Sequence, residues 1–521
     1  MSTPIHTGLF GVILRLYFIL ALALTGAETQ AQISTNTPAL EAALLELDSG
    51  NIVQAILYLD RHLAVQPEDA SSLLFRGNLH LEMGDLDGAV ADYRRSLHLQ
   101  PANDSAWYNL GYAYYLAGEY AEAIFFYDSA LSLNDGSPFY WASRGDAFLE
   151  ISRYTLAMDD YRKALLRDEA FPMALYGIGL VYFYQGEYDS ARYYFSLAII
   201  QDPFDPDYYY QRGIVKTYTG DMQGAMYDFD FALDLEPAHV PSRLSRGLLR
   251  ADSGNLRGAL DDYSAGLAVD SLDIELLNER GVLYLAMEDY RSALGDFSRI
   301  AAEQPGMAEA YYNRGLAYLG LNRAAEAKAD FDQAILIDPG DPFYFLQRAN
   351  ALYAMGKLDE AFTEYETVVR MAPRNPDVRM EVGKMFLDSE QYDRSLSELQ
   401  TVFRIDPEYP GLFLAMAKVY AAQEDIETAM RHFDLAIIQD VQDPEIFFER
   451  GLMLYDLGNL QGALDDFNNT IELDPHSPSA FMNRGLVKFE TGDRQGACMD
   501  WKKAFQLGSS SAQQMLQKHC R

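Results

Sequence analysis

AEAYYNRGLAYLGLNRAAEAKADFDQAILIDPGD, residues 308–341, has the pattern of two amphipathic helices joined by a short turn. Apolar and small residues recur three and four positions apart in each half, which gives each predicted helix one apolar face. Gly315 and Ala327 are small, so the two helices can approach closely, and Pro339 ends the pair because proline cannot continue a helix. A helix pair of this size cannot bury its own apolar face, and it therefore needs similar pairs on both sides.

Copies of this helix pair fill most of the chain. Prolines recur at spacings of 34 residues or multiples of 34, from Pro67 to Pro475. Counted from the first residue of each repeat, position 8 is always glycine or alanine, position 20 is alanine except at Ser395, and position 24 is aromatic in twelve repeats. Residues 36–511 thus divide into fourteen repeats, expected to begin at residues 36, 70, 104, 138, 172, 206, 240, 274, 308, 342, 376, 410, 444 and 478.

The pattern resembles the tetratricopeptide repeat (TPR) family, in which small residues occupy positions 8 and 20, an aromatic residue position 24 and proline position 32. The resemblance covers about nine tenths of the chain. It implies an all-α fold, a right-handed α-solenoid or superhelix of about fourteen 34-residue helix-turn-helix repeats, followed by a capping helix within residues 512–521. Because each repeat would contact only its neighbours, we expect one tandem array and no separate globular domain.

Residues 1–31 have the layout of a secretory signal peptide. Arg15 precedes an uninterrupted apolar run, Leu16–Leu24, and small and polar residues then lead to a predicted cleavage point after Ala31. The run is shorter than the roughly 20 residues of a membrane span, but apolar character extends back to Gly8, so an uncleaved anchor is the alternative. We therefore predict an exported protein, periplasmic or extracellular, that contacts a membrane only if this segment is retained.

The chain is strongly acidic, with a formal net charge of −36 at pH 7. Such a surface repels nucleic-acid phosphates and anionic lipid head groups, and it attracts basic partners. The excess of Asp and Glu has a simpler alternative explanation, which is that it keeps a long array soluble. The charge therefore argues against a nucleic-acid partner and leaves a basic protein or peptide partner open.

Arginine at position 7 accompanies an acidic residue at position 23 of the same repeat in nine repeats. Of the five repeats without this arginine, only one has an acidic residue at position 23, Glu398. The co-occurrence favours an ion pair between the two helices of a repeat over the alternative, a row of arginines that binds a ligand. The representative pairs are Arg144 with Asp160, Arg212 with Asp228, and Arg314 with Asp330.

In the family that the repeats resemble, the first helices line a concave groove, and positions 2, 5, 9 and 12 project into it. Position 5 and its neighbours are rich in tyrosines and amides, which suit contacts with an extended peptide. The alternative is that the tyrosines pack between successive first helices. The candidate peptide-binding residues are Tyr108, Asn109, Tyr112, Tyr115, Tyr176, Tyr210, Gln211, Tyr312 and Asn313.

The sequence lacks the short motifs of nucleotide, ester and zinc chemistry. It contains no GxxxxGK[ST] phosphate loop, no GxSxG elbow and no HExxH helix, and its histidines show no recurring ligand spacing. The repeats also leave no room for a fused catalytic domain. We therefore predict a protein that is not an enzyme and that uses no cofactor, no metal ion and no small-molecule substrate.

The two cysteines of the chain, Cys498 and Cys520, lie on either side of a predicted turn near Gly508. Ser509–Ser511 supply N-cap chemistry for a final helix over residues 512–519, and antiparallel helices would bring the cysteines together. In an oxidising compartment they would form a disulfide that pins the cap, and the alternative is two free thiols. The last repeat also resembles the terminal repeat of exported bacterial TPR proteins.

Together these features predict a non-catalytic scaffold for protein–protein interactions in the cell envelope, with a peptide or partner segment bound in the groove. One alternative is a regulatory or assembly subunit of an envelope enzyme complex. The other is a rigid spacer that makes its contacts through the convex face.

Overall fold

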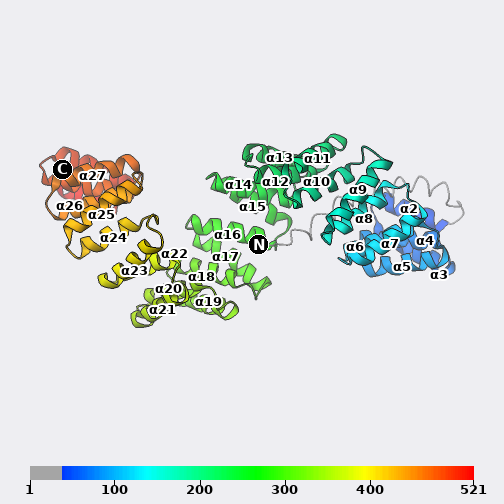
Figure 1. The fold of residues 1–521 in the computed structure, drawn as a ribbon, viewed down its shortest axis with the longest axis horizontal. Coiled ribbons are helices and arrows are strands. Elements are labelled where there is room, and N and C mark those ends of the chain that lie inside the picture. The colour runs from blue at the N-terminus through cyan, green and yellow to red at the C-terminus, as the bar shows by residue number, and fades with distance from the viewer. Residues whose placement is uncertain (1–37, 521) are drawn as a thin grey trace. The chain divides into compact units, whose positions relative to one another are not determined.

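The computed structural model describes residues 38–520, and their regular structure consists of 29 helices, α2–α30, arranged as successive antiparallel pairs (Figure 1). The predicted all-α repeat array is confirmed. The predicted signal peptide, residues 1–31, lies outside the described residues. The chain forms two compact bodies, which we call the N-terminal body, up to Leu283, and the C-terminal body, from Tyr284 onward.

The helices of the N-terminal body are α2 Pro38–Asp48, α3 Ile52–Val65, α4 Ala70–Glu82, α5 Leu86–Leu99, α6 Asp104–Leu116, α7 Tyr120–Leu133, α8 Pro138–Glu150, α9 Tyr154–Arg167, α10 Pro172–Tyr184, α11 Tyr188–Gln201, α12 Pro206–Tyr218, α13 Met222–Leu235, α14 Val240–Asp252 and α15 Leu256–Val269. The division between the bodies falls within α16, Ile274–Ala286.

The helices of the C-terminal body are α17 Tyr290–Glu303, α18 Ala308–Gly320, α19 Ala324–Ile337, α20 Pro342–Ala354, α21 Leu358–Met371, α22 Pro376–Asp388, α23 Tyr392–Ile405, α24 Leu412–Ala422, α25 Ile426–Gln439, α26 Pro444–Asp456, α27 Leu460–Leu473, α28 Pro478–Glu490, α29 Arg494–Gln506 and α30 Ser510–His519. Even-numbered helices from α2 to α28 are the first helices of their repeats, and odd-numbered helices from α3 to α29 are the second helices.

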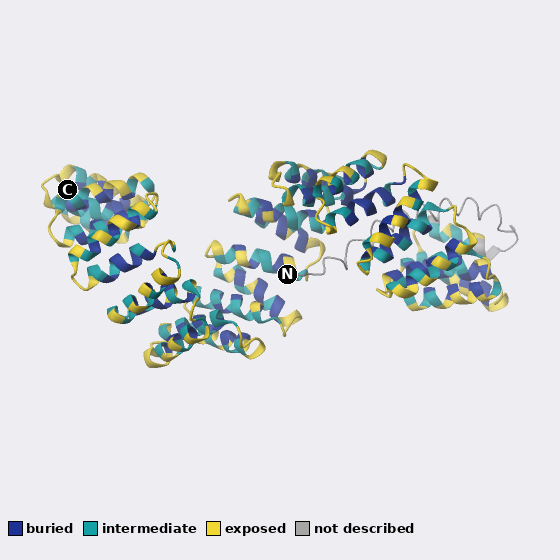
Figure 2. Ribbon diagram, viewed as in Figure 1, coloured by how far each residue is buried: buried dark blue, intermediate teal, exposed yellow. Residues whose placement is uncertain are grey.

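The core of each repeat is an aromatic or leucine side chain at position 24 packed against the small residue at position 8. In the repeat of α12 and α13, Phe229 is fully buried, and a Cβ atom added at Gly213 would lie 2.6 Å from its ring. Ala225, at position 20, is fully buried as well. Small residues at these two positions therefore let the paired helices close on the ring. Figure 2 shows the resulting pattern, with buried faces along the helices and exposed turns between them.

Helix ends follow the local sequence. Many first helices begin with proline, whose missing N–H would have no partner in the first turn. In α12 this proline, Pro206, follows the N-cap Asp205, whose carboxylate accepts a hydrogen bond from the Asp207 backbone N–H at 3.0 Å. Helix α24 begins at Leu412, two positions later in its repeat than the other first helices from α4 to α28, because Gly411 before it adopts a left-handed conformation with φ of +72°.

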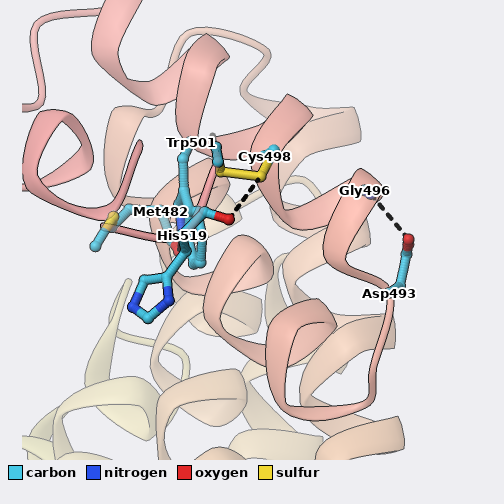
Figure 3. The surroundings of a disulfide bond; sticks show 7 residues. Met482, Asp493, Gly496, Cys498, Trp501 and His519 are labelled. Carbon is cyan, nitrogen blue, oxygen red and sulfur yellow. Dashed lines mark hydrogen bonds between the residues drawn. A yellow bond between two sulfur atoms is a disulfide. The ribbon is translucent and has the colours of Figure 1, made fainter. Parts of the chain in front are cut away.

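The last helix, α30, covers the end of the array, and a disulfide joins it to α29 (Figure 3). Cys498 and Cys520 form this bond, with 5.7 Å between their Cα atoms. Trp501 is fully buried beneath α30, and its indole N–H donates to the backbone carbonyl of Met482 at 3.3 Å. The helix begins at Ser510, two residues before the predicted start, because Ser509 provides the N-cap and accepts from the Ala512 N–H.

Candidate partner-binding surface

The position-7 arginines join the two helices of their own repeats. Arg144 donates from Nε and Nη2 to both carboxylate oxygens of Asp160, at 2.7 and 2.8 Å. Arg314 forms the same fork with Asp330, at 2.7 and 2.6 Å, and this hydrogen bond raises the pKa of the guanidinium. Eight of the nine expected pairs show such a contact within one body. The ninth, Arg280 with Asp296, spans the division between the bodies and stays a prediction.

Eight of the nine arginines also reach back to position 25 of the preceding repeat, a contact that was not predicted from the sequence. Arg76 Nη1 lies 2.6 Å from Asp60, and Arg348 Nη1 lies 2.9 Å from Asp332. A hydroxyl or an amide oxygen replaces the carboxylate in some repeats, as for Arg212 with Ser196, Arg280 with Ser264, and Arg484 with Asn468. Seven of these guanidinium groups therefore contact both their own repeat and the preceding one, which favours a structural role over a ligand-binding ladder.

A sequence signal for this link exists at position 25 itself. The residue is Asp, Ser or Asn before every repeat that carries the arginine. Before the four later repeats that lack the arginine, position 25 is Arg94, Arg162, Glu366 or Gln400. A comparison of position 7 with position 25 of the preceding repeat would have found the pairing.

The tyrosines of α6 contact the following first helix, α8. Tyr112 and Tyr115 are buried, and the Tyr115 hydroxyl donates to the Glu150 carboxylate at 3.4 Å. The Tyr108 hydroxyl lies 3.1 Å from Ser143 Oγ, and its ring stacks on Tyr140 with 4.8 Å between the centroids. These contacts agree with packing between successive first helices, the alternative for these tyrosines.

The remaining candidate peptide-binding residues follow the same trend. Asn109 is buried and donates to the side-chain oxygen of Asn78 at 2.8 Å. Tyr176 and Tyr210 are buried, and Asn313 is buried as well. Gln211 and Tyr312 are half-buried, and the rings of Tyr312 and Tyr344 are in contact, with 5.2 Å between their centroids. Direct peptide binding by the nine candidates stays a prediction, and most of their surface already packs against neighbouring repeats.

A partly exposed aromatic surface lies at the turn end of the first helices in the N-terminal body. We call it the aromatic edge and define it as Tyr154, Phe183, Tyr184, Tyr188 and Tyr218. Tyr184 and Tyr218, the last residues of α10 and α12, are 39% and 64% exposed. The rings touch from one repeat to the next, with 6.1 Å between Tyr154 and Tyr184 and 5.4 Å between Tyr188 and Tyr218. Tyr184 and Tyr218 were not predicted from the sequence, because both lie at position 13, one beyond the last position expected to face the groove.

One family model, described as tetratricopeptide repeat, matches residues 40–104, 76–138, 143–206, 278–342 and 346–410. These segments span more than half of the chain, and a second model of the same description matches residues 416–480. The chain belongs to the tetratricopeptide repeat family. Among curated proteins, none matches this TPR protein significantly.

Several solved structures are similar to this TPR protein. The Cut9–Hcn1 hetero-tetramer of APC/C has 14% identity and a TM-score of 0.38, covering 88% of this chain and 98% of that one. MamA has 27% identity and a TM-score of 0.28, and the match covers 31% of this chain and 94% of MamA. YrrB is described as a TPR protein with an unusual peptide-binding site. It has 24% identity and a TM-score of 0.28, and the match covers 35% of this chain and 95% of YrrB.

A buried polar network connects two TPR repeats through α12 and α14. His239 lies between Asp207, at 3.0 Å from Nε2, and Ser242, at 2.8 Å from Nδ1. An arrangement of aspartate, histidine and serine like this one occurs in the active sites of hydrolases. Here the Ser242 side chain is fully buried, so no substrate can reach its hydroxyl. Burial and the nearby Asp207 carboxylate raise the pKa of Asp205, the N-cap of α12, to about 8. We interpret the network as part of the packing between these repeats.

The described residues hold neither a metal-binding cluster nor a membrane-spanning helix. In residues 38–520, no three or more histidine, cysteine or carboxylate side chains converge as a metal site would require. Within that same range, no helix is both long enough and apolar enough to cross a membrane.

Proposed function

We propose that this TPR protein is a non-catalytic scaffold that binds a peptide or a partner segment along the surface formed by its first helices. Proteins of this family bind protein or peptide partners. The proposal rests on the continuity of the aromatic edge, where rings of successive repeats contact each other and two of them, Tyr184 and Tyr218, are exposed. A surface that extends across several repeats can hold an extended segment of a partner.

Two exposed tyrosines on the second helices of the same repeats lack this continuity. Tyr193 and Tyr227, at position 22 of α11 and α13, are 59% and 64% exposed. Their ring contacts lie within their own repeats, with Tyr194 and Phe231 respectively. The first-helix surface is therefore the better candidate, and a spacer that binds through its second helices is the competing function.

We also propose that the protein is exported and of the bacterial type. The Cys498–Cys520 disulfide supports an oxidising compartment such as the periplasm or the cell exterior, because cytosolic thiols are normally kept reduced. The predicted signal peptide and the resemblance of the last repeat to exported bacterial TPR proteins point in the same direction. A retained N-terminal anchor is the alternative, and it would place the same array at a membrane surface.

Lysine substitutions on the two helix surfaces test the proposed function. Leu248 and Val282 are exposed at position 9 of first helices, whereas Leu166 and Ile200 are exposed at position 29 of second helices. We expect Leu248→Lys/Val282→Lys to lose a partner that the native chain captures from an envelope extract, because a charge would be buried in the interface. The matched variant Leu166→Lys/Ile200→Lys should retain it.

Circular dichroism and thermal unfolding would show that both variants are folded. Loss of the partner by the second-helix variant alone would contradict the proposal and support the spacer. Failure of the native chain to capture any specific protein would contradict the scaffold function altogether.

A further inference from the structure

Four side chains form a row at position 13, at the ends of four successive first helices in the N-terminal body. They are Glu150 on α8, Tyr184 on α10, Tyr218 on α12 and Asp252 on α14. Tyr184, Tyr218 and Asp252 are exposed, and Glu150 is half-buried. We call these four residues the edge row. The row therefore places two tyrosines of the aromatic edge between two carboxylates, with one side chain in each repeat.

The rings beside the edge row extend its apolar surface. Phe183 contacts Tyr218 with 5.4 Å between the centroids, and it contacts Tyr188 at 5.9 Å. Tyr154 stacks on Tyr184 with only 14° between the ring planes. Neighbouring rings thus support the two exposed tyrosines, and this limits the conformational entropy that they lose when a partner binds.

The electrostatic environment of the edge row is negative. Burial and the Glu150 carboxylate raise the pKa of Tyr184 above its usual range. Burial and Glu150 likewise raise the pKa of the nearby Asp146 to about 7. The adjoining turns contribute two further carboxylates, Glu187 and Asp221, and one cation, Arg153. The whole chain carries a formal charge of −36, so long-range attraction also favours a basic partner.

We propose that the edge row binds a basic, extended segment of a partner protein. Lysine or arginine side chains of that segment would lie on the faces of Tyr184 and Tyr218, whose π-electrons attract cations. Glu150 and Asp252 would pair with cations at either end of the segment. The inference rests on the proposed scaffold function and adds to it the location of the site and the charge of the partner.

The chain itself shows that its aromatic rings accept cations in this geometry. Arg323 lies over the Tyr318 ring, with its guanidinium carbon 4.5 Å from the centroid. The Lys163 ammonium group lies 4.6 Å from the Trp141 ring. An acidic segment would be repelled by the carboxylates of the edge row, and a purely apolar segment would gain nothing from them. A basic segment satisfies both the rings and the carboxylates.

Peptide binding to the intact chain tests the proposal. The probe is a labelled peptide of about a dozen residues with arginine at alternate positions, and its control has citrulline, the neutral isostere, in place of each arginine. Binding is followed by fluorescence anisotropy at about 0.15 M salt, which screens long-range attraction to the acidic surface. We expect the arginine peptide to bind at least about tenfold more tightly than the citrulline peptide.

Variants then locate the binding site. Tyr184→Ala/Tyr218→Ala should weaken binding of the arginine peptide by about tenfold or more, whereas Tyr184→Phe/Tyr218→Phe should keep most of it because the ring faces remain. The matched control is Tyr193→Ala/Tyr227→Ala, which removes two similarly exposed tyrosines from the second helices of the same repeats. It should bind like the native chain.

A charge variant covers the case in which the alanine variant does not fold. Glu150→Gln/Asp252→Asn keeps the shapes of both side chains and should weaken binding several-fold. If the edge-row variants and the matched control lose the same affinity for the arginine peptide, the peptide is attracted to the acidic protein in general, and the proposal is overturned. Unchanged binding in both edge-row variants would overturn it as well.

The outcome can be separated from a failure of the scaffold function. If Tyr184→Ala/Tyr218→Ala captures the same cellular partner as the native chain, the scaffold function holds and the edge row is not its site. If the native chain captures no partner, the scaffold function fails regardless of how the arginine peptide binds.

Discussion

Replacing Asp228 with alanine is expected to destabilise the repeats around α13 by about 3–5 kcal/mol. The carboxylate is fully buried, it accepts hydrogen bonds from Arg212 at 2.9 and 2.7 Å, and it pairs with Lys216 at 2.8 Å. Its removal leaves two partly buried cations without a counter-charge, and that costs more than the pair itself contributes. Hydrogen exchange in α12 and α13 would measure the change, since repeat arrays open locally.

Another repeat of the chain shows which apolar residues can replace this ion-pair cluster in a control variant. The repeat that begins at Asp104 has Leu110, Tyr114 and Phe126 at the positions of Arg212, Lys216 and Asp228, and the rings of Tyr114 and Phe126 lie 5.1 Å apart. We expect Arg212→Leu/Lys216→Tyr/Asp228→Phe to recover most of the lost stability, because apolar contacts replace the ion pairs. If Asp228→Ala lowers the stability of these repeats by less than about 1 kcal/mol, the structural role of the arginines is contradicted.

The variant Cys498→Ser/Cys520→Ser is expected to destabilise the C-terminal cap by about 3 kcal/mol. The disulfide closes a loop with a sequence separation of 22 residues, and without it the unfolded cap gains conformational freedom. Opening of α30 also exposes the buried Trp501 ring, so hydrogen exchange of this helix and tryptophan fluorescence both report the change.

Reductant provides the matched comparison for this variant. It should loosen α30 in the native protein to the same extent and leave the double serine variant unchanged. Two titratable thiols in native protein isolated without reductant would contradict the disulfide. The same result would remove the structural support for an oxidising compartment.

The sequence was sufficient to predict the repeat architecture because its determinants lie within one repeat. Gly315 and Ala327 indicate where two helices close on an aromatic ring, and the ring, Phe331, is fully buried. The pairing of Arg314 with Asp330 could be predicted for the same reason, since both residues belong to one helix pair. The link from Arg348 to Asp332 crosses a repeat boundary, and it requires comparing different positions in neighbouring repeats.

The partner surface was harder to predict because position alone does not determine burial. Tyr112 and Tyr115 face the next first helix as well as the expected groove, and contact with that helix buries them. Tyr184 and Tyr218 lie one position further along, at the helix ends, where the turn leaves them exposed. That difference depends on the spacing of successive first helices, which the periodicity of the sequence does not specify.

The most direct measurement of the central claim is the hydrogen-exchange footprint of a captured partner on the intact chain. We predict slower exchange at the C-terminal ends of the first helices α10 and α12 when the partner is bound, with little change at the outer residues of α11 and α13. Protection confined to the second helices would contradict the claim, because it would place the partner on the opposite surface.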